Sequence, residues 1–229
     1  GAFKPLFYAR FLRLISSLVF GRLYYYLGFL GRLASLSGRI NSLLPERIHT
    51  QRLILRPLDN SDADDVLEYQ SHSEVTQFVP WRPRINEEGK PAAIIRKTST
   101  FERKGDALVV GWELQAENKV IGQNILTLTS AEERTANIGW VTNPHYWRNG
   151  YAAEATGAVI EQAFRLADLN RIDAHIDQRN PNSAALARRL GMTLEGVFKG
   201  ASFIKGDGGW CDMWLYSIFA PGEESVIGV

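Results

Sequence analysis

The feature that most constrains the fold is a run of three strand-like segments followed directly by a helix-like segment. Residues 107–115 and 120–128 are rich in β-branched and aromatic residues, and the polar turn AENK between them predicts a β-hairpin. Residues 135–142 continue as a third strand, and residues 151–167 carry small and apolar residues at helical spacing. This run predicts a sheet that contains antiparallel strands and has a helix packed against it.

Further strands and helices are predicted on both sides of this run. Alternating apolar residues predict strands, whereas helical spacing behind cap-type residues predicts helices. The predicted strands are 52–58, 171–177, 194–205 and 210–220, of which the last two flank the turn GDGG, and the predicted helices are 60–70, 86–103 and 182–190. Together these segments predict an α/β fold in which a mixed sheet has helices on both faces.

Charge divides the chain into an extension (1–45), a domain (46–220) and a tail (221–229). The extension holds six basic residues and no acid, which leaves 20 of the 26 Lys and Arg residues against all 25 Asp and Glu residues. An acidic domain gives nucleic-acid binding little support. The hydrophobic fraction of 45% is typical of a folded protein. The single cysteine, Cys211, excludes an internal disulfide, so we expect a cytoplasmic protein.

The extension places Phe, Leu and Tyr residues at helical spacing with arginines to one side, which predicts an amphipathic helical hairpin. The arginines interrupt its apolar runs before they reach the ~20 residues that a membrane-spanning helix needs. Three interpretations stay open. The hairpin packs on the domain or on a second subunit as a homodimer, it lies on an anionic membrane surface, or it is a targeting segment. Membrane association through residues 1–45 is therefore an alternative to a purely cytoplasmic location.

The segment PHYWRNGYAAEA, residues 144–155, joins a predicted strand to a predicted helix. The first N–H groups of a helix have no partner within it, and together with the helix dipole they form a site for an anion. Gly150 allows the backbone to approach a phosphate closely, and Arg148 adds positive charge. On these residues alone, an ordinary turn is the first interpretation and a phosphate site is the alternative.

Four segments carry a resemblance to a known family: RLILRPL, IGWVTNPHYWRNGYAAEA, RIDAHIDQRNPNSAALARRLGMTLEG and WCDMWLYSI. In this order, over residues 50–219, they resemble the GNAT superfamily of N-acetyltransferases. Within it they are similar to the RimJ/RimL branch, which acetylates N-termini of ribosomal proteins. The resemblance implies a central, mostly antiparallel GNAT sheet, acetyl-CoA as cosubstrate, an amine acceptor and no metal. It does not cover residues 1–45.

The resemblance also implies a set of cofactor-binding residues. The family's pyrophosphate loop falls on residues 147–152, where Trp147 replaces the usual first polar residue. Strands 135–142 and 171–177 would splay apart, and the pantetheine arm would fill the gap between them. The implied acetyl-CoA-binding residues are Trp140, Val141, Thr142, Arg148, Asn149, Gly150, Tyr151, Ala152, Asn180 and Ser183.

The implied reaction is direct attack of a neutral amine on the acetyl thioester, with protonation of the leaving thiolate. The tyrosine that supplies this proton in many relatives is replaced here by Ala187. We predict Ser183 as the substitute acid, with capping of its helix as the alternative. We predict Glu113 or Asp212 as the base. The alternative interpretation of Glu113 is a solvated residue on the face of the sheet. The alternative interpretation of Asp212 is that it anchors a substrate amine or a backbone turn.

The acceptor follows from the weakness of this predicted base, because strand 135–142 contains no carboxylate. An α-amino group with a pKa near 8 is roughly 10% neutral at pH 7, whereas a lysine near 10.4 is roughly 0.04% neutral. A protein or peptide N-terminus, or a weakly basic small-molecule amine, is therefore the predicted acceptor. The alternative function is a non-catalytic acyl-CoA-binding or scaffold protein that acts through its N-terminal helices.

Two further groups of residues have competing interpretations. Trp81 in FVPWRPR is predicted to line the acceptor cleft together with Glu113 and Asp212, or else to fill the core. Asp173, His175 and Asp177 alternate onto one face of a strand. A polar sheet face explains this alternation better than a metal site does.

Overall fold

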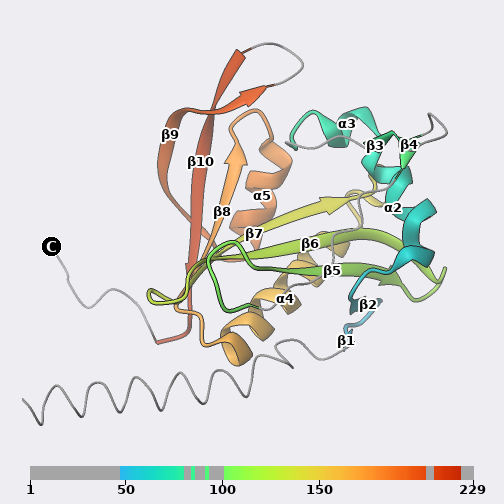
Figure 1. Cartoon of the computed structure of the whole chain (residues 1–229), viewed down its shortest axis with the longest axis horizontal. Coiled ribbons are helices and arrows are strands. Elements are labelled where there is room, and N and C mark those ends of the chain that lie inside the picture. Colours follow the sequence, from blue (N-terminus) through green and yellow to red (C-terminus); the bar gives the residue numbers. More distant parts are fainter. Residues whose placement is uncertain (1–46, 80–83, 86–90, 93–100, 205–208, 223–229) are drawn as a thin grey trace, which may run out of the picture. The chain divides into compact units, whose positions relative to one another are not determined.

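The computed structural model of the chain describes residues 47–79, 84–85, 91–92, 101–204 and 209–222. Within them, eight strands form one sheet in the order β1-β2-β5-β6-β7-β8-β10-β9, and β3 and β4 form a separate pair (Figure 1). The strands are β1 (Ile48–His49), β2 (Leu53–Arg56), β3 (Arg84–Ile85), β4 (Pro91–Ala92), β5 (Ala107–Leu114), β6 (Lys119–Ser130), β7 (Thr135–Thr142), β8 (Arg171–Asp177), β9 (Thr193–Ile204) and β10 (Gly209–Phe219). The helices are η2 (Asn60–Asp62), α2 (Ala63–Gln70), α3 (Ser73–Thr76), η3 (Pro144–Tyr146), α4 (Tyr151–Ala167) and α5 (Pro181–Arg189). The predicted helical hairpin over residues 1–45 and the predicted cleft residue Trp81 lie outside the described residues.

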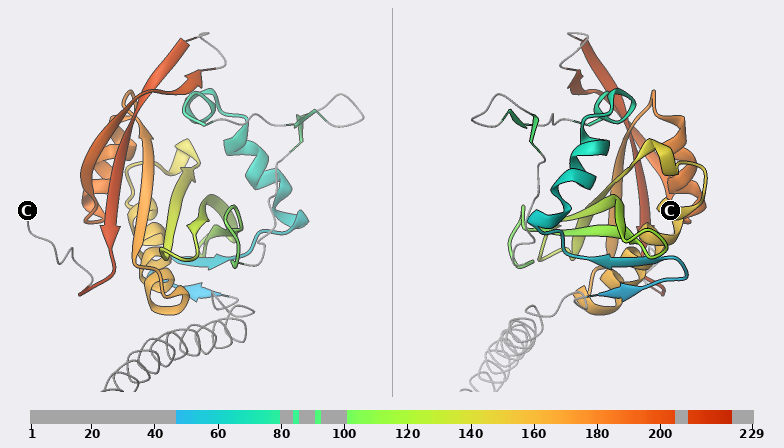
Figure 2. Two further views of the ribbon diagram at one scale, coloured as in Figure 1. Left: turned by 60° about the vertical axis from the view of Figure 1, so that its left-hand side comes forward. Right: turned by 90° about the vertical axis from the view of Figure 1, so that its right-hand side faces the viewer.

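The sheet is mixed, since its strands pair antiparallel except for β7 and β8, which pair in parallel. Parallel neighbours need a long crossover connection, and α4 supplies it. Helices α2 and α3 lie on one side of the sheet, and α4 and α5 lie on the other (Figure 2). The predicted mixed, mostly antiparallel sheet with helices on both faces is confirmed.

Helix α2 is held on the sheet by apolar packing and by one polar contact. A buried cluster joins the helix to the strands: Leu58, Val66, Tyr69, Val109 and Val120. The carboxylate of Asp65 accepts a hydrogen bond from the backbone N–H of Val120 at 2.9 Å. This contact ties the first turn of α2 to the start of β6, so α2 has a defined position along the sheet.

The opposite face carries a buried polar network that ties α4 to the strands. The indole Nε1 of Trp112 donates to Oδ1 of Asn124 at 2.8 Å. The amide Nδ2 of Asn124 in turn donates to Thr156 Oγ1 of α4 at 3.1 Å and to the Gly139 carbonyl of β7 at 3.2 Å. Trp112, Asn124 and Thr156 are fully buried, so each of these bonds replaces water that the groups have lost. The network fixes the start of α4 relative to β7.

Strands β7 and β8 pair over three residues each and then separate. The paired segments are residues 135–137 of β7 and residues 171–173 of β8. Beyond them β7 continues to Thr142 beside β6, and β8 continues to Asp177 beside β10. The splay expected between these strands is therefore present, and it opens the sheet toward their carboxyl ends.

The prediction of a helix over residues 86–103 is wrong at the residues of this segment that the structure describes, 91–92 and 101–103. Pro91 begins the two-residue strand β4, and residues 101–106 form bends and a turn. Proline has no amide hydrogen and its ring clashes with the carbonyl four residues earlier, so it disfavours a helix interior. The structure instead has the short helix α3 directly after α2, where no helix was predicted.

Candidate active site

A cavity of about 700 Å³ opens where β7 and β8 separate. Its wall is formed by the end of β7, the loop before α4, the first turn of α4, the end of β8, the first turns of α5, and α3 with the residues after it. This volume is in the range of small-molecule sites. The predicted residues that line it are Trp140, Val141, Thr142, Arg148, Gly150, Tyr151, Ala152, Asn180 and Ser183. The predicted Asn149 does not line the cavity and contributes its backbone carbonyl to the adjoining loop instead.

The loop before α4 presents the amino end of that helix to the cavity. Gly150 is the N-cap residue, with a left-handed backbone (φ 82°), and Arg148 also has a positive φ of 63°. Because Gly150 has no side chain, it cannot cap the first amides of α4 as Ser or Asp would. Ala152 and Ala153 of the first turn line the cavity. The amides without a side-chain cap and the dipole of the 17-residue helix together favour an anionic group here.

The back of this loop is held by Arg52, which precedes β2. Its guanidinium donates to Glu154 Oε2 at 2.7 Å and to the Asn149 carbonyl at 2.9 Å, and it lies 4.3 Å from the ring centroid of Tyr151. Thr50 also donates to Glu154, at 2.7 Å. Burial raises the pKa of Glu154, but the hydrogen bonds from Thr50 and Arg52 outweigh this effect and leave the pKa below its usual value. The loop is therefore anchored before any ligand arrives.

The other edge of the cavity is the start of α5. Asn180 is the N-cap of this helix, and its Oδ1 accepts from the Ser183 N–H at 3.0 Å. The alternative in which Ser183 merely caps the helix is therefore wrong, since Asn180 does so. The indole Nε1 of Trp140 donates to the Ser183 hydroxyl oxygen at 3.3 Å. Trp140 thus bridges from β7 to α5 and leaves the hydroxyl proton of Ser183 available as a donor.

Basic side chains give the cavity a partly positive wall. Arg148, Arg179 and Arg189 line it. Arg179 binds Asp177 through Nε at 3.0 Å and through a terminal nitrogen at 2.7 Å. Burial raises the pKa of Asp177, but Arg179 reverses the shift and lowers it overall. Within the described part of the chain, Arg148 and Arg189 have no ion pair, so both guanidinium groups are available to a phosphate-bearing ligand.

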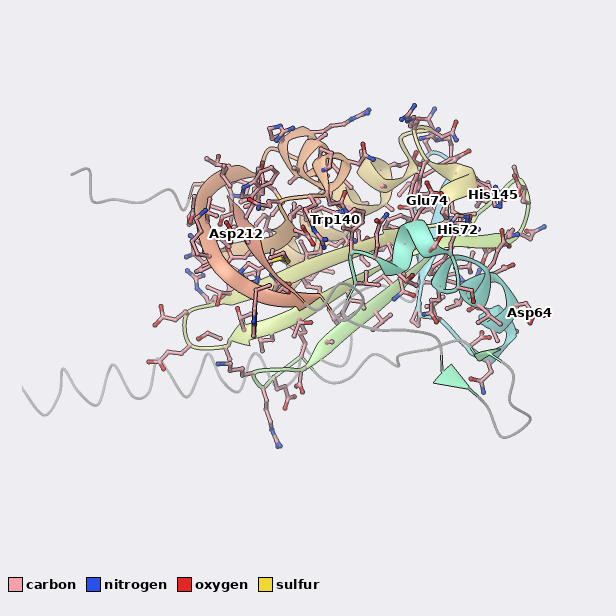
Figure 3. All side chains as sticks on the ribbon, turned by 90° about the horizontal axis from the view of Figure 1, so that it is seen from above. Asp64, His72, Glu74, Trp140, His145 and Asp212 are labelled. Atoms are coloured by element: carbon pink, nitrogen blue, oxygen red, sulfur yellow. The ribbon has the colours of Figure 1, made fainter. Side chains whose placement is uncertain are left out.

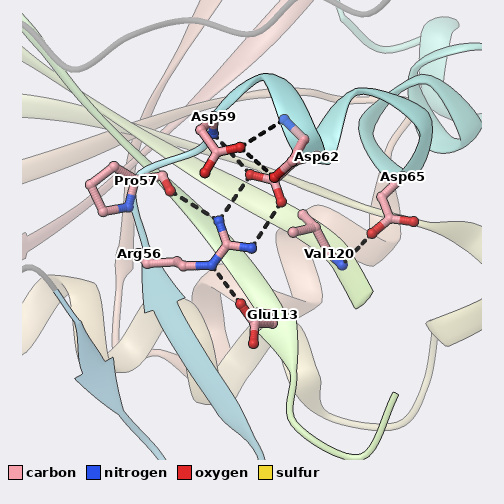
Figure 4. A network of polar contacts seen from close by, with 8 residues as sticks. Arg56, Pro57, Asp59, Asp62, Asp65, Glu113 and Val120 are labelled. Carbon is pink, nitrogen blue, oxygen red and sulfur yellow. Dashed lines mark hydrogen bonds and ion pairs between the residues drawn. The ribbon is translucent and has the colours of Figure 1, made fainter. Parts of the chain in front are cut away.

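The two carboxylates predicted as bases lie elsewhere. Glu113 of β5 pairs with Arg56, whose guanidinium also binds both carboxylate oxygens of Asp62 at 2.8 and 2.9 Å (Figure 4). Asp212 of β10 accepts from Lys199 at 2.7 Å and from the Gly200 N–H at 2.9 Å. Neither carboxylate lines the cavity. The geometry favours a structural role for both, and their predicted roles in catalysis and acceptor binding gain no support from it.

Figure 3 shows that Asp212 lies far from α3. Asp212 is on one side of the view, Glu74 lies with His72 and His145 on the other side, and Trp140 lies between them. Glu74 belongs to α3 and lines the cavity, as do Gln77 and Phe78, which follow that helix. The sequence analysis missed these residues, because a four-residue helix leaves no periodic signal.

The alternating polar residues of β8 have different surroundings in the structure. Asp173 accepts from Arg171 at 2.7 Å, and Asp177 is bound by Arg179, so both belong to ion pairs on the sheet face. His175, which lies between them, lines the cavity, as Asp177 also does. The alternation gave no reason to single out His175. In the described ranges, no three or more His, Cys, Asp or Glu side chains are grouped to hold a metal ion. None of the described helices is long and apolar enough to cross a membrane.

The chain is similar to known acetyltransferases in sequence and in fold. Residues 52–193 match the family model described as acetyltransferase (GNAT) domain. The uncharacterized N-acetyltransferase YnaD of Bacillus subtilis is 35% identical over 171 residues, which are 75% of this chain and 95% of YnaD. The structure of a GNAT-family acetyltransferase from Bacillus anthracis superposes with a TM-score of 0.62 at 27% identity, covering 78% of this chain and 99% of that one. The ribosomal-protein-S5-alanine acetyltransferase of Vibrio fischeri shares the fold, with a TM-score of 0.63 at 21% identity, over 78% of this chain and 99% of that chain.

Proposed function

Because the chain belongs to the GNAT family of acetyltransferases, and is thus an acetyl-CoA-dependent acyltransferase, we propose that it acetylates a weakly basic primary amine. The acceptor that we favour is the α-amino group of a protein or peptide N-terminus, with a small-molecule amine as the second choice. The observation that carries the proposal is the cavity between β7 and β8, which has an anion site at one mouth and the polar Trp140–Ser183 pair at its edge.

The residues around the cavity fit acetyl-CoA. The amides at the start of α4 and the left-handed Gly150 form the cradle for the pyrophosphate, and Arg148 and Arg189 supply charge beside it. The gap past residue 137, where β7 lacks its β8 neighbour, would take the pantetheine arm. In this arrangement backbone groups near Trp140 and Val141 bind the arm, and an N–H can polarise the thioester carbonyl.

The proposed reaction joins the amine nitrogen to the carbonyl carbon of the thioester and breaks the carbon–sulfur bond. The nitrogen loses one proton, and the departing sulfur takes one from the Ser183 hydroxyl, which solvent then restores. Trp140 orients Ser183 because the indole occupies the hydroxyl oxygen as an acceptor at 3.3 Å. The hydroxyl hydrogen is thereby directed away from Trp140 and toward the cavity.

A weakly basic amine suits this site because its neutral form is already abundant at neutral pH. The two carboxylates predicted as bases, Glu113 and Asp212, are held in ion pairs away from the cavity. Asp177 lines the cavity, but Arg179 holds it with a lowered pKa, which makes it a weak base.

The test is release of the CoA thiol from acetyl-CoA in the presence of single amines. The acceptors are peptides with free N-termini, the same peptides with a blocked N-terminus and one lysine, and a set of small primary amines. We expect turnover with the free N-termini and much less with the blocked peptides. Turnover with lysine alone would overturn the proposed acceptor class. Binding of acetyl-CoA without thiol release from any amine would favour the non-catalytic scaffold.

A further inference from the structure

We propose that His175 is the general base of this enzyme, the group that takes the proton from the attacking amine. The inference rests on the proposed function, because it assigns a role within that same cavity. It starts from the contrast on β8, where the two neighbouring carboxylates are occupied by arginines and the imidazole is not. His175 has no hydrogen-bond partner among the described residues, and its side chain is exposed to the cavity that it lines.

Strand pairing shows which side of the sheet His175 faces. Tyr216 of β10 lies directly opposite Ala174, and cross-strand neighbours project to the same face. The Tyr216 hydroxyl accepts from Arg188 of α5 at 2.9 Å, so this face is the one that α5 covers. His175 is the next residue along the strand and therefore projects to the face opposite α5.

Ser183 belongs to α5, so the proposed acid and the proposed base lie on opposite sides of the sheet at its gap. In direct attack, the amine approaches one face of the carbonyl carbon, and the sulfur leaves from a different position around that carbon. An imidazole on one face and a hydroxyl on the other match these two positions. The amine would then enter from the side of α3, whose Glu74 also lines the cavity.

The imidazole of His175 is positioned by contact with an aromatic ring and not by a hydrogen bond to a described residue. Phe198 of β9 lies edge-on to it, with ring centroids 5.6 Å apart and an interplanar angle of 79°. An apolar contact of this kind restricts the ring while leaving both nitrogens open to a substrate. Imidazole is also the side chain that most often serves as a general base in enzymes, which suits this position.

The charges around His175 come from several elements. On β8 itself, Asp173 is paired with Arg171 and Asp177 with Arg179. On β9, Glu195 also binds Arg171, and Lys199 binds Asp212 of β10. The buried thiol of Cys211 on β10 lies beside Asp177, and the cavity wall adds Glu74 of α3, Arg148 of the loop and Arg189 of α5. These four acids on β8 to β10 are each paired with a base, although Asp173 and Glu195 share Arg171.

In the proposed step the amine nitrogen forms its bond to the carbonyl carbon as His175 accepts one N–H proton. The carbon–sulfur bond breaks, and the sulfur leaves as a thiolate that Ser183 protonates. The imidazolium afterwards loses its proton to solvent, and solvent returns one proton to Ser183, so the net products are the amide and the free thiol. This step needs both a neutral amine and a neutral imidazole.

The experiment is a pH profile of kcat/KM for the full-length enzyme, using a peptide amine of known pKa. Two groups must be deprotonated in the wild-type enzyme, so the acid limb of the logarithmic plot should reach a slope of 2. The variant His175→Gln should lower kcat by about 10² to 10⁴-fold near pH 7 and reduce that slope to 1, which the amine alone supplies. Its affinity for acetyl-CoA, measured by calorimetry, should match the wild type and so show that the fold is intact.

Two further variants complete the test. His49→Gln removes an exposed imidazole on β1, outside the cavity, and should leave both slope and kcat unchanged. His175→Ala should regain activity when free imidazole is added, a rescue that a purely structural role would not produce. A slope of 2 in His175→Gln, or a kcat within twofold of wild type, would overturn the assignment of the base and leave the acetyltransferase intact. A wild-type enzyme that is inactive on every amine would overturn the base together with the proposed function.

Discussion

Gly150 decides how the amides of α4 meet a phosphate, because it holds a left-handed backbone at the N-cap. A Cβ added there would lie 3.5 Å from a guanidinium nitrogen of Arg52, which is an ordinary contact, so Gly150→Ala adds backbone strain without a clash. Gly150→Glu adds the same strain and places an anion at the proposed pyrophosphate position. By calorimetry we expect Gly150→Glu to weaken acetyl-CoA binding by about 100-fold or more, and Gly150→Ala by about 10-fold or less. Equal affinities of Gly150→Glu and wild type would remove this loop from the cofactor site.

Ser183 is predicted to act on the chemical step and not on cofactor binding. Its backbone N–H is bound by Asn180 and its hydroxyl oxygen by Trp140, so Ser183→Ala preserves the helix cap and deletes one hydroxyl. We expect kcat to fall by about 10²-fold while the affinity for acetyl-CoA stays within about twofold. Steady-state kinetics and calorimetry on the same preparation separate the two effects. An unchanged kcat would mean that water protonates the thiolate.

Single residues were predictable where a local pattern fixes their position. The place of Gly150 and Ala152 at a helix start, and of Asn180 at the next one, follows from short motifs whose members are neighbours in the chain. Glu113 was not predictable in this way, because its partner Arg56 lies 57 residues earlier and reaches it only through strand pairing. The cavity position of His175 likewise depends on the separation of β7 and β8.

At the scale of elements, the segment directly before β2 is joined to α4 by the contact between Arg52 and Glu154. A carboxylate whose pKa is lowered in the folded state stabilises the protein above its unfolded pKa, and this contribution is lost as the pH falls through the folded value. Glu154→Gln should therefore lower the free energy of unfolding by about 1 kcal/mol at pH 7, a modest figure because Arg52 is partly exposed. The difference from wild type should begin to shrink as the pH falls below the ordinary pKa of a glutamate, about 4.3, and should be lost as the pH falls further through the lowered folded pKa.

Denaturant unfolding at pH 7 and pH 3 measures this difference. Glu161→Gln is the matched control, since Glu161 is an exposed residue of the same helix and should change the stability little at either pH. A difference between wild type and Glu154→Gln that is as large at pH 3 as at pH 7 would contradict the assigned ion pair.

Element types followed from the sequence wherever the pattern was long. The 17-residue α4 and the strands β5 to β8 repeat their period several times, and they were predicted within a few residues. The segment 86–103 was misread because its apolar spacing outweighed the proline at position 91. Helix α3 has four residues, which is about one turn, so tertiary contacts and not periodicity establish it.

At the scale of the whole molecule, the basic extension and the domain are predicted to act separately. Every predicted cofactor-binding residue lies at Trp140 or beyond, so deletion of residues 1–45 should leave the affinity for acetyl-CoA unchanged. The same deletion should change the oligomeric state, measured by light scattering, or abolish flotation with anionic vesicles. Vesicle binding should weaken with added salt if the arginines carry it. A truncated protein that fails to fold would show that the extension belongs to the domain core.

The short pairing of β7 with β8 also has a mechanical consequence. In the eight-stranded sheet, three residue pairs between β7 and β8 join the part that ends in β7 to the part that contains β8, β10 and β9. By contrast, β6 and β7 are paired along most of the length of β7. A sheet resists shear through the hydrogen bonds between its strands, so its stiffness is lowest along the boundary between β7 and β8, here called the seam. A ligand arm in the gap between β7 and β8 would form hydrogen bonds to both strands and would add links that the two strands lack on their own. Force applied across the sheet would then rupture the seam at a higher load when the cosubstrate is bound than when it is absent.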